Sequence, residues 1–213
     1  MNPSAEALLL RHVPAAAVAY CVQLKADFGF QLRTTRPRSS KWGDYRYHRS
    51  SDRALHTITV NQDLNRYAFL ITYLHEVAHR VAFEQHGFRI RPHGSAWKRC
   101  FQELLAPVLT EAVFPSDVLG PLCHYIRNPR ASTGADPALT VALQHHDEVT
   151  GHPPKAPLSE LASGTVFRFR QRIFIKKHVR RTRSLCQEIA TNSNYLILET
   201  TLVERIHYAK LTS

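Results

Sequence analysis

Apolar and polar residues change spacing along the first sixty positions, from a helical to a strand-like pattern. An apolar run predicts a helix from Pro14 to Asp27, because a proline in the first turn lacks only an N–H that a helix start leaves unpaired. Three stretches of strand character follow, and β-branched residues mark the third. We interpret residues 30–35, 42–48 and 56–60 as an antiparallel three-strand meander.

A long amphipathic helix is predicted after these strands. Its apolar positions recur at spacings of four and three, which places them on one helical face. Asp63 or Asn65 is the predicted N-cap, and Gly87 is a natural C-terminal stop. Further helices are predicted from Ser95 to Leu105 and from Ser116 to Arg127. The apolar stripe consists of Tyr67, Ile71, Leu74, Ala78 and Val81.

The composition shifts in the last third of the chain. Pro, Ser, Thr, Gly and Ala dominate from residue 128 to 164, which is typical of a linker, and residues 137–146 fit one short helix within it. Strand patterns return after Thr165. We therefore predict an α+β fold with three parts: a domain over 1–127, a linker over 128–164 and a small basic β-rich subdomain over 165–213. The predicted strands of that subdomain cover 166–170, 173–177, 195–199 and 201–206.

The sequence His75-Glu76-Val77-Ala78-His79 lies within the long helix and has the HExxH spacing. Positions four apart share one helical face, so both imidazoles can reach a single ion, and neutral imidazole is a good zinc ligand. The carboxylate of Glu76 lies beside them, where it can act as a general base. We predict that His75 and His79 bind one zinc ion and that Glu76 is catalytic.

A catalytic zinc site needs a third protein ligand. The extended HExxHxxGxxH pattern is absent, and His86 lies two turns beyond His79, too far to share its ion. His93 follows the Gly87 break, where a turn can bring its ring back, and Ser95 could cap the returning helix. We favour His93, with Glu103 and then Glu111 as the competing ligands.

The cysteines and the hydropathy favour an intracellular protein without disulfide bonds or membrane spans. Cys21, Cys100, Cys123 and Cys186 form no CxxC pair, so we expect free and mostly buried thiols, as in a reducing cytoplasm. No run of 18 apolar residues is present, which predicts no membrane contact. The predicted location is the cytoplasm, including its nucleoid.

The net charge points to a polyanionic partner. Lys and Arg total 28 against 17 Asp and Glu, a formal charge of +11, and nucleic acid is the commonest polyanion in a cell. We therefore predict contact with DNA, including single strands. The densest cluster has eight cations within sixteen residues: Arg168, Arg170, Arg172, Lys176, Lys177, Arg180, Arg181 and Arg183.

Aromatic residues interleave with this basic cluster. Phe167, Phe169 and Phe174 could stack on bases, but the same alternation also describes an ordinary hairpin with a buried aromatic face. A second, smaller basic patch lies in the first strand region, where a solvated turn is an equal explanation. It comprises Arg33, Arg36, Arg38 and Lys41.

With HEVAH followed 14 residues later by PHGSAW, the chain resembles the SprT-like family of zinc metallopeptidases, which includes the Spartan-type DNA-repair proteases. The resemblance is good from Thr57 to Arg127, and Trp97 matches the aromatic that follows the family's His-Gly motif. It implies a minimal zincin with an open cleft, in which His75, His79 and His93 hold zinc and Glu76 is the general base. Characterised eukaryotic members cleave proteins trapped on DNA, and their activity depends on DNA.

One departure from the family is clear. Many relatives carry a four-cysteine zinc ribbon after the protease unit, whereas the corresponding region here has only Cys186, so a second zinc ion is not expected.

These observations predict a zinc-dependent peptidase that acts on protein substrates in association with DNA. The strand from His56 to Val60 could pair with an extended substrate, and Tyr125 or His124 could supply a further electrophile. One alternative is a nucleic-acid-binding or transcription-associated protein whose zinc site is structural or vestigial. Another is a peptidase that cuts one dedicated partner and ignores DNA.

Overall fold

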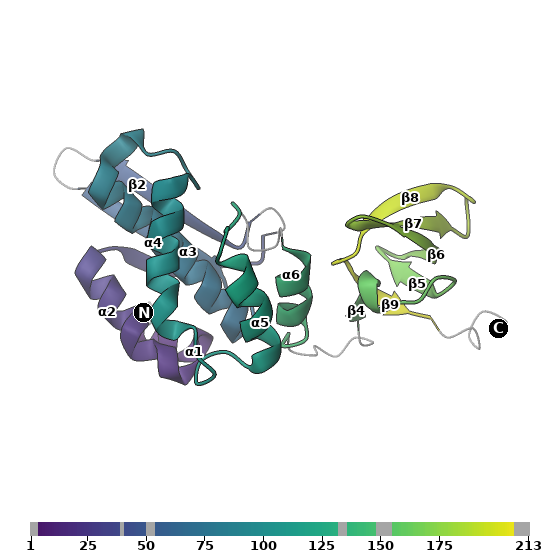
Figure 1. The fold of residues 1–213 in the computed structure, drawn as a ribbon, viewed down its shortest axis with the longest axis horizontal. Helices are drawn as coiled ribbons and strands as arrows, with labels where there is room; N and C mark the ends of the chain where they lie inside the picture. Colours follow the sequence, from purple (N-terminus) through teal and green to yellow (C-terminus); the bar gives the residue numbers. More distant parts are fainter. Residues whose placement is uncertain (1–3, 39–40, 50–53, 132–135, 148–154, 207–213) are drawn as a thin grey trace. The chain divides into compact units, whose positions relative to one another are not determined.

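A computed structural model describes residues 4–38, 41–49, 54–131, 136–147 and 155–206 of the protein. The chain divides into two compact units, Met1–Asp147 and Glu148–Ser213 (Figure 1). In the described part of the chain, no helix combines the length and the apolarity that crossing a membrane requires. The four cysteines are free thiols, and all but Cys123 are buried, as predicted.

Two short helices open the first unit, and the first of them lies before the predicted helix. They are α1 (Ala5–His12) and α2 (Val18–Phe28), and the 3-10 turn η1 (Ala15–Ala17) separates them. Proline disfavours helical backbone in the residue before it, and Val13 is accordingly extended, with φ −115° and ψ 161°. The helix predicted from Pro14 to Asp27 therefore corresponds to η1 and α2, with Pro14 as the N-cap of η1.

The first unit contains a three-stranded mixed sheet. Its strands are β1 (Gln31–Thr35), β2 (Gly43–Arg49) and β3 (Ala54–Asn61), in the order β1-β3-β2. β2 pairs with β3 antiparallel, but β1 pairs with β3 parallel. The predicted antiparallel meander was therefore wrong, because β3 lies between the other two strands.

Asn61 shows why the chain crosses over rather than turning back. The connection between β1 and β2 passes the end of β3, where the buried Asn61 side chain bonds it at three points. The amide of Asn61 donates to the carbonyls of Arg38 at 3.1 Å and Lys41 at 3.2 Å, and its oxygen accepts from Arg38 Nε at 2.8 Å. β3 also contributes Ile58 and Val60, both fully buried, which favours the central position.

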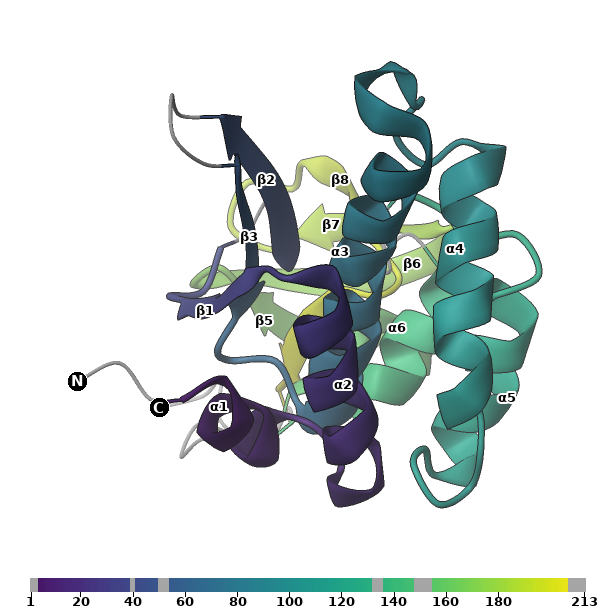
Figure 2. The same ribbon diagram turned by 90° about the vertical axis from the view of Figure 1, so that its left-hand side faces the viewer.

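Helix α3 (Arg66–His86) runs through the core of the first unit. Asn65 caps it, as one of the two predicted residues, and its side-chain oxygen accepts from the backbone N–H of Tyr67 and Ala68. Residues 68–78 are all buried. α3 packs between the sheet and α4 (Ser95–Leu105) (Figure 2). The N-cap of α4 is Gly94 without a side-chain bond, so the predicted cap at Ser95 was wrong.

The remaining helices complete the first unit. They are α5 (Ser116–Tyr125) and α6 (Pro137–Gln144), together with the 3-10 turns η2 (Gly87–Arg89) and η3 (Ala106–Val108). α6 matches the short helix predicted at 137–146. Asn65 Nδ2 donates to the carbonyl of Leu143 and to Asp147 Oδ1, both at 2.7 Å. These bonds fix the end of α6 against the start of α3.

The second unit is a six-stranded antiparallel sheet in the order β4-β9-β5-β6-β7-β8. A small core of seven buried residues lies on one face of it and includes Phe167, Phe174 and Val203. The strands are β4 (Lys155–Pro157), β5 (Val166–Phe169), β6 (Arg172–Arg180), β7 (Arg183–Glu188), β8 (Asn194–Leu198) and β9 (Leu202–Arg205), with the 3-10 turn η5 (Leu158–Glu160).

β5, β6, β8 and β9 correspond to predicted strands, whereas β4 and β7 do not. β7 buries Ser184, Cys186 and Glu188 while its other residues face outward. Two of the inward residues are polar and are bonded there: Ser184 donates to Glu199, and Glu188 accepts from Arg172. Hydrophobic alternation therefore does not reveal this strand.

Candidate metal centre

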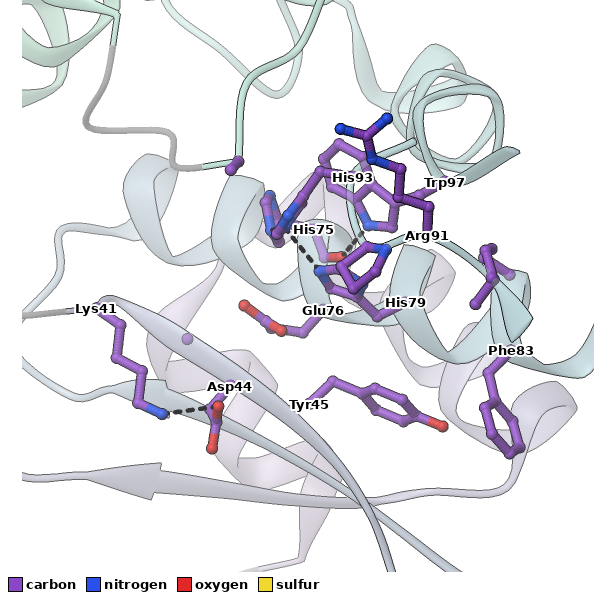
Figure 3. Close-up of a pocket in the computed structure, with 15 residues that line it drawn as sticks. Lys41, Asp44, Tyr45, His75, Glu76, His79, Phe83, Arg91, His93 and Trp97 are labelled. Carbon is purple, nitrogen blue, oxygen red and sulfur yellow. Dashed lines mark hydrogen bonds and ion pairs between the residues drawn. The ribbon is translucent and has the colours of Figure 1, made fainter. Parts of the chain in front are cut away.

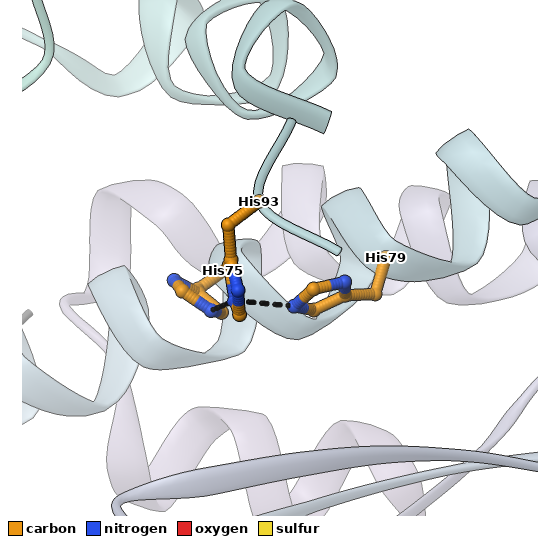
Figure 4. A group of neighbouring side chains, drawn as sticks. All are labelled: His75, His79 and His93. Carbon is orange, nitrogen blue, oxygen red and sulfur yellow. Dashed lines mark hydrogen bonds between the residues drawn. The ribbon is translucent and has the colours of Figure 1, made fainter. Parts of the chain in front are cut away.

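Three imidazole rings converge beside α3 (Figure 4). His75 and His79 lie one turn apart on that helix, so both rings project from the same face. The Nε2 atom of His93 lies 3.2 Å from Nε2 of His75 and 3.0 Å from Nε2 of His79. The ligand atoms of the three residues all lie within 4.8 Å of one another, and the group could hold a metal ion.

His93 reaches this point from the turn between α3 and α4. Its backbone is left-handed, with φ 57°, and the N–H of Gly94 closes the turn by donating to the carbonyl of Arg91 at 3.0 Å. The competing residues Glu103 and Glu111 are exposed and lie outside the group. His86 is also exposed, and it lies outside the group as predicted.

Trp97 supports the three rings from α4. Its side chain is fully buried, and its ring centroid lies 4.5 Å from that of His75 and 4.7 Å from that of His93. The indole Nε1 donates to the carbonyl of His75 at 3.4 Å, and the ring stacks on Phe101. A fixed indole against two of the imidazoles limits how far they can rotate.

The distances from His93 Nε2 to the other two nitrogens fit a shared cation. Ligands at ~2.0–2.1 Å from a tetrahedral zinc ion lie roughly 3.3 Å from one another, close to the observed 3.0 and 3.2 Å. His75 Nδ1 is buried and finds no hydrogen-bond partner in the described part of the chain, so the polar contact of this ring is at Nε2. The donor set and its spacing suit zinc.

The environment keeps these rings neutral, which is the form that binds a metal. Burial lowers the pKa of His79 to about 3, with the nearby His93 as a further cause. Burial also lowers the pKa of His75 well below its usual value, and the other two rings add to this. The pKa of His93 is lowered by burial alone.

The carboxylate of Glu76 lies between the three imidazoles and strand β2 (Figure 3). The residue is only 6% exposed. Burial raises the pKa of Glu76 to about 8, and the charge of Asp44 raises it further. Lys41 and the backbone N–H of Tyr45, which donates to the carboxylate, partly oppose this rise. A carboxyl with a pKa near neutrality suits a group that takes up and releases a proton.

A cavity of about 420 Å³ contains the three histidines and Glu76. Lys41, Asp44 and Tyr45 of the β2 region line it, and none of the three was predicted as part of the site. The alternation of Tyr45 and Tyr47 identifies a strand, but no sequence signal places that strand against α3. Phe83 and Ile90 form the apolar part of the lining.

Tyr45 lies flat against His79, with ring planes 6° apart, and its hydroxyl bonds His56 Nδ1 at 2.8 Å. Neither of the predicted electrophiles lines the cavity: His124 is exposed, and the hydroxyl of Tyr125 donates to the carbonyl of Arg130. These two residues are therefore not at the site.

Seven of the eight clustered cations of the second unit are exposed. Lys176 is the exception, because it is only 2% exposed and its Nζ donates to the carbonyl of Leu158 and to Glu199. Arg172 pairs with Glu188, and Arg168 pairs with Glu204. The remaining exposed cations are Arg170, Lys177, Arg180, Arg181 and Arg183.

The aromatic residues of this cluster form a core rather than a stacking surface. Phe167 and Phe174 are buried and stack on each other with centroids 5.6 Å apart, so the hairpin interpretation holds for them. The smaller patch in the first unit is also partly engaged. Arg38 bonds Asn61, and Lys41 pairs with Asp44 at 2.7 Å.

Comparison with known proteins gives one match, in the first unit. Residues 15–114 match the sequence model of the SprT-like family. This segment contains the three-stranded sheet, helices α3 and α4, and all three histidines. No curated protein and no solved structure matches the chain at a significant level.

Proposed function

Residues 15–114 belong to the SprT-like family, and on that premise we propose that the protein is a zinc-dependent peptidase. The observation that carries the proposal is the convergence of three neutral imidazoles beside one buried carboxyl. We assign His75, His79 and His93 as the zinc ligands and Glu76 as the general base. A zinc ion, when bound, supplies a Lewis acid that polarises a carbonyl and acidifies water.

Glu76 moves the proton in this mechanism. Its carboxylate accepts the proton of the attacking water and returns it to the amine that leaves when the peptide bond breaks. The cavity shields the carboxyl from bulk water, and its pKa near neutrality allows both steps.

The substrate backbone pairs with β2 in this proposal, not with the strand from His56 to Val60. That strand lies within β3, which is paired on both sides, so it has no free edge. β2 is an edge strand of the described sheet, and Lys41, Asp44 and Tyr45 bring its start into the cavity. Edge strands offer backbone groups that an extended peptide can bond.

We also propose that the second unit binds DNA, including single strands. The support is the set of exposed cations that form no ion pair with any described carboxylate, five of them between residues 170 and 183. Such a surface attracts phosphates, and its affinity falls steeply with salt. Buried Lys176 is left out of this surface, and Arg168 and Arg172 are partly neutralised by their glutamates.

Glu76→Gln tests the peptidase. The amide keeps the shape of the side chain but cannot accept the proton, so we expect cleavage to fall roughly 10²- to 10⁴-fold with zinc content unchanged. The measurement is the rate at which zinc-loaded protein degrades a labelled DNA-binding protein, with and without a single-stranded oligonucleotide. Glu103→Gln is the matched control, because that glutamate is exposed on α4 and lies outside the metal group.

The two arms with and without DNA separate the alternatives. Stimulation by the oligonucleotide supports a DNA-associated peptidase, and equal rates support one with a dedicated partner. If the wild-type protein binds DNA but cleaves nothing in either arm, the site is structural or vestigial. An active Glu76→Gln variant would show that the proposed mechanism is wrong.

A further inference from the structure

Gly43 lies where β2 passes closest to the catalytic carboxyl. A Cβ atom at this position would lie 2.5 Å from Glu76 Oε1, 2.8 Å from Glu76 Cγ and 2.7 Å from Thr72 Cγ2. Real Cβ atoms essentially never come within 3.0 Å of another heavy atom, so something must shift if a methyl is added. Gly43 does not have a positive φ. The glycine is therefore required by space and not by backbone conformation.

The helix backbone that carries these two side chains cannot give way. Thr72 is 3% exposed and Glu76 is 6% exposed, and both lie on the stretch of α3 in which every residue from 68 to 78 is buried. Protein interiors are close-packed, so displacing that stretch would disturb the core on its far side. The carboxyl of Glu76 or the start of β2 must shift instead.

We propose that Gly43 is a positioning residue for Glu76, an inference that rests on the proposed function. The missing side chain lets β2 lie directly against the carboxylate. A methyl at 43 drives the carboxylate and the strand apart by roughly an ångström, which is the distance from a clash to ordinary contact. A displacement of that size at a reacting group can cost about 100-fold in rate.

Gly43→Ala separates positioning from folding. We expect kcat to fall about 100-fold, by more than any change in KM, while zinc content stays at the wild-type level. The zinc ligands are not among the atoms that the methyl meets. Gly120→Ala is the matched control, because Gly120 has a negative φ, nothing within 4 Å of its added Cβ, and a place on α5 away from the cavity. The readout is cleavage of the same labelled DNA-binding protein, with metal content measured in parallel.

Thermal unfolding of the metal-free protein tests the same contact without any activity. Gly43→Ala should lower the Tm of the first unit by roughly 5 °C, a typical effect of overpacking. In a Glu76→Ala background, Gly43→Ala should lower the Tm much less. Adding Thr72→Ser should remove most of the Tm loss that is left. Such coupling identifies the two side chains that the methyl meets.

The peptidase assay and the Tm measurements test separate claims. A wild-type protein without peptidase activity sinks the proposed function, whereas additive Tm shifts for positions 43 and 76 sink the contact on which this inference depends. Wild-type kcat in Gly43→Ala would overturn the positioning role even if the coupling is found. A Gly43→Ala protein that loses zinc would overturn it too, since the damage would then lie at the ligands.

Discussion

Two buried glutamates, one in each unit, have pKa values displaced in opposite directions. Glu76 is 6% exposed and Glu188 is 4% exposed. Burial raises the pKa of Glu76 to about 8, with help from Asp44. Hydrogen bonds from Arg172 and then from Thr191 lower the pKa of Glu188 to about 2. At Glu188 the hydrogen-bond donors outweigh the effect of burial, whereas at Glu76 burial dominates the pKa.

The two units also differ in whether their buried polar groups have partners of opposite charge. In the second unit buried charge is matched by charge, as when Lys176 donates to Glu199 and to the carbonyl of Leu158. In the first unit three imidazoles and a carboxyl face one another, and Lys41 in the cavity lining pairs with Asp44 and not with Glu76. Matched buried charges stabilise a fold, whereas converging unmatched ligands provide a place for a cation that the chain does not itself supply.

Removing one of the three imidazoles should have the largest effect of the changes considered, because it takes away a proposed metal ligand. His79→Ala leaves two of three imidazoles, so we expect zinc affinity to fall by at least about 100-fold, more than typical losses from changes outside the ligand shell. The measurement is competition with a chelator, together with metal content after dialysis. His86→Ala is the control, since His86 lies on the same helix and is exposed. Wild-type affinity in His79→Ala would exclude the assigned ligand set.

Lys176→Met should have the next largest effect, confined to the second unit. It leaves Glu199 without its cation, and breaking such a pair costs about 3 kcal/mol. Hydrogen exchange of the β6 amides reports on this unit, while tryptophan fluorescence reports only on the first, because the two tryptophans are Trp42 and Trp97. Lys177→Met is the exposed control. Equal exchange in both variants would show that the pair contributes no net stability.

A pH-dependent shift in Tm should distinguish the two buried glutamates by its sign. The pKa of Glu76 is raised from 4.5 to about 8 on folding, so its contribution to stability is present below pH 4.5 and is lost as pH rises through 8. Metal-free Glu76→Gln should therefore gain Tm relative to wild type between pH 5 and 8, followed by tryptophan fluorescence. A Tm difference between variant and wild type that stays constant from pH 5 to 8 would mean that Glu76 is not buried as described.

Glu188→Gln should show the opposite dependence. The folded pKa of Glu188 is about 2, below its usual 4.5, so its contribution is present above pH 4.5 and is lost as pH falls toward 2. The deficit of the variant should therefore shrink in acid, measured by exchange in β6.

Local features of the sequence predicted where the helices and strands lie better than they predicted which elements pair with each other. Asn65 and Gly87 delimit α3 because capping depends on a few adjacent residues. The position of β3 between β1 and β2 depends on Asn61 bonding a connection some twenty residues earlier, and periodicity carries no such information. β7 was missed because its inward positions include bonded polar residues.

The residues of the candidate site also fall into two groups, those that the sequence predicts and those that only the tertiary packing brings together. The HExxH spacing brings His75 and His79 together on any regular helix, so these two follow from sequence alone. The choice of His93 over Glu103 rested on a turn whose geometry only the structure gives. Gly43 and Tyr45 reach Glu76 through the packing of β2 on α3, which no local pattern encodes.

The left-handed backbone of His93 affects how this centre can be lost over evolution. Asparagine and glycine adopt that conformation with little cost, whereas branched residues strain it. A descendant with asparagine at position 93 would keep the turn, and we expect its overall shape to be unchanged while it has one ligand fewer. Inactive relatives of this kind would be recognised by that single side chain and not by their fold.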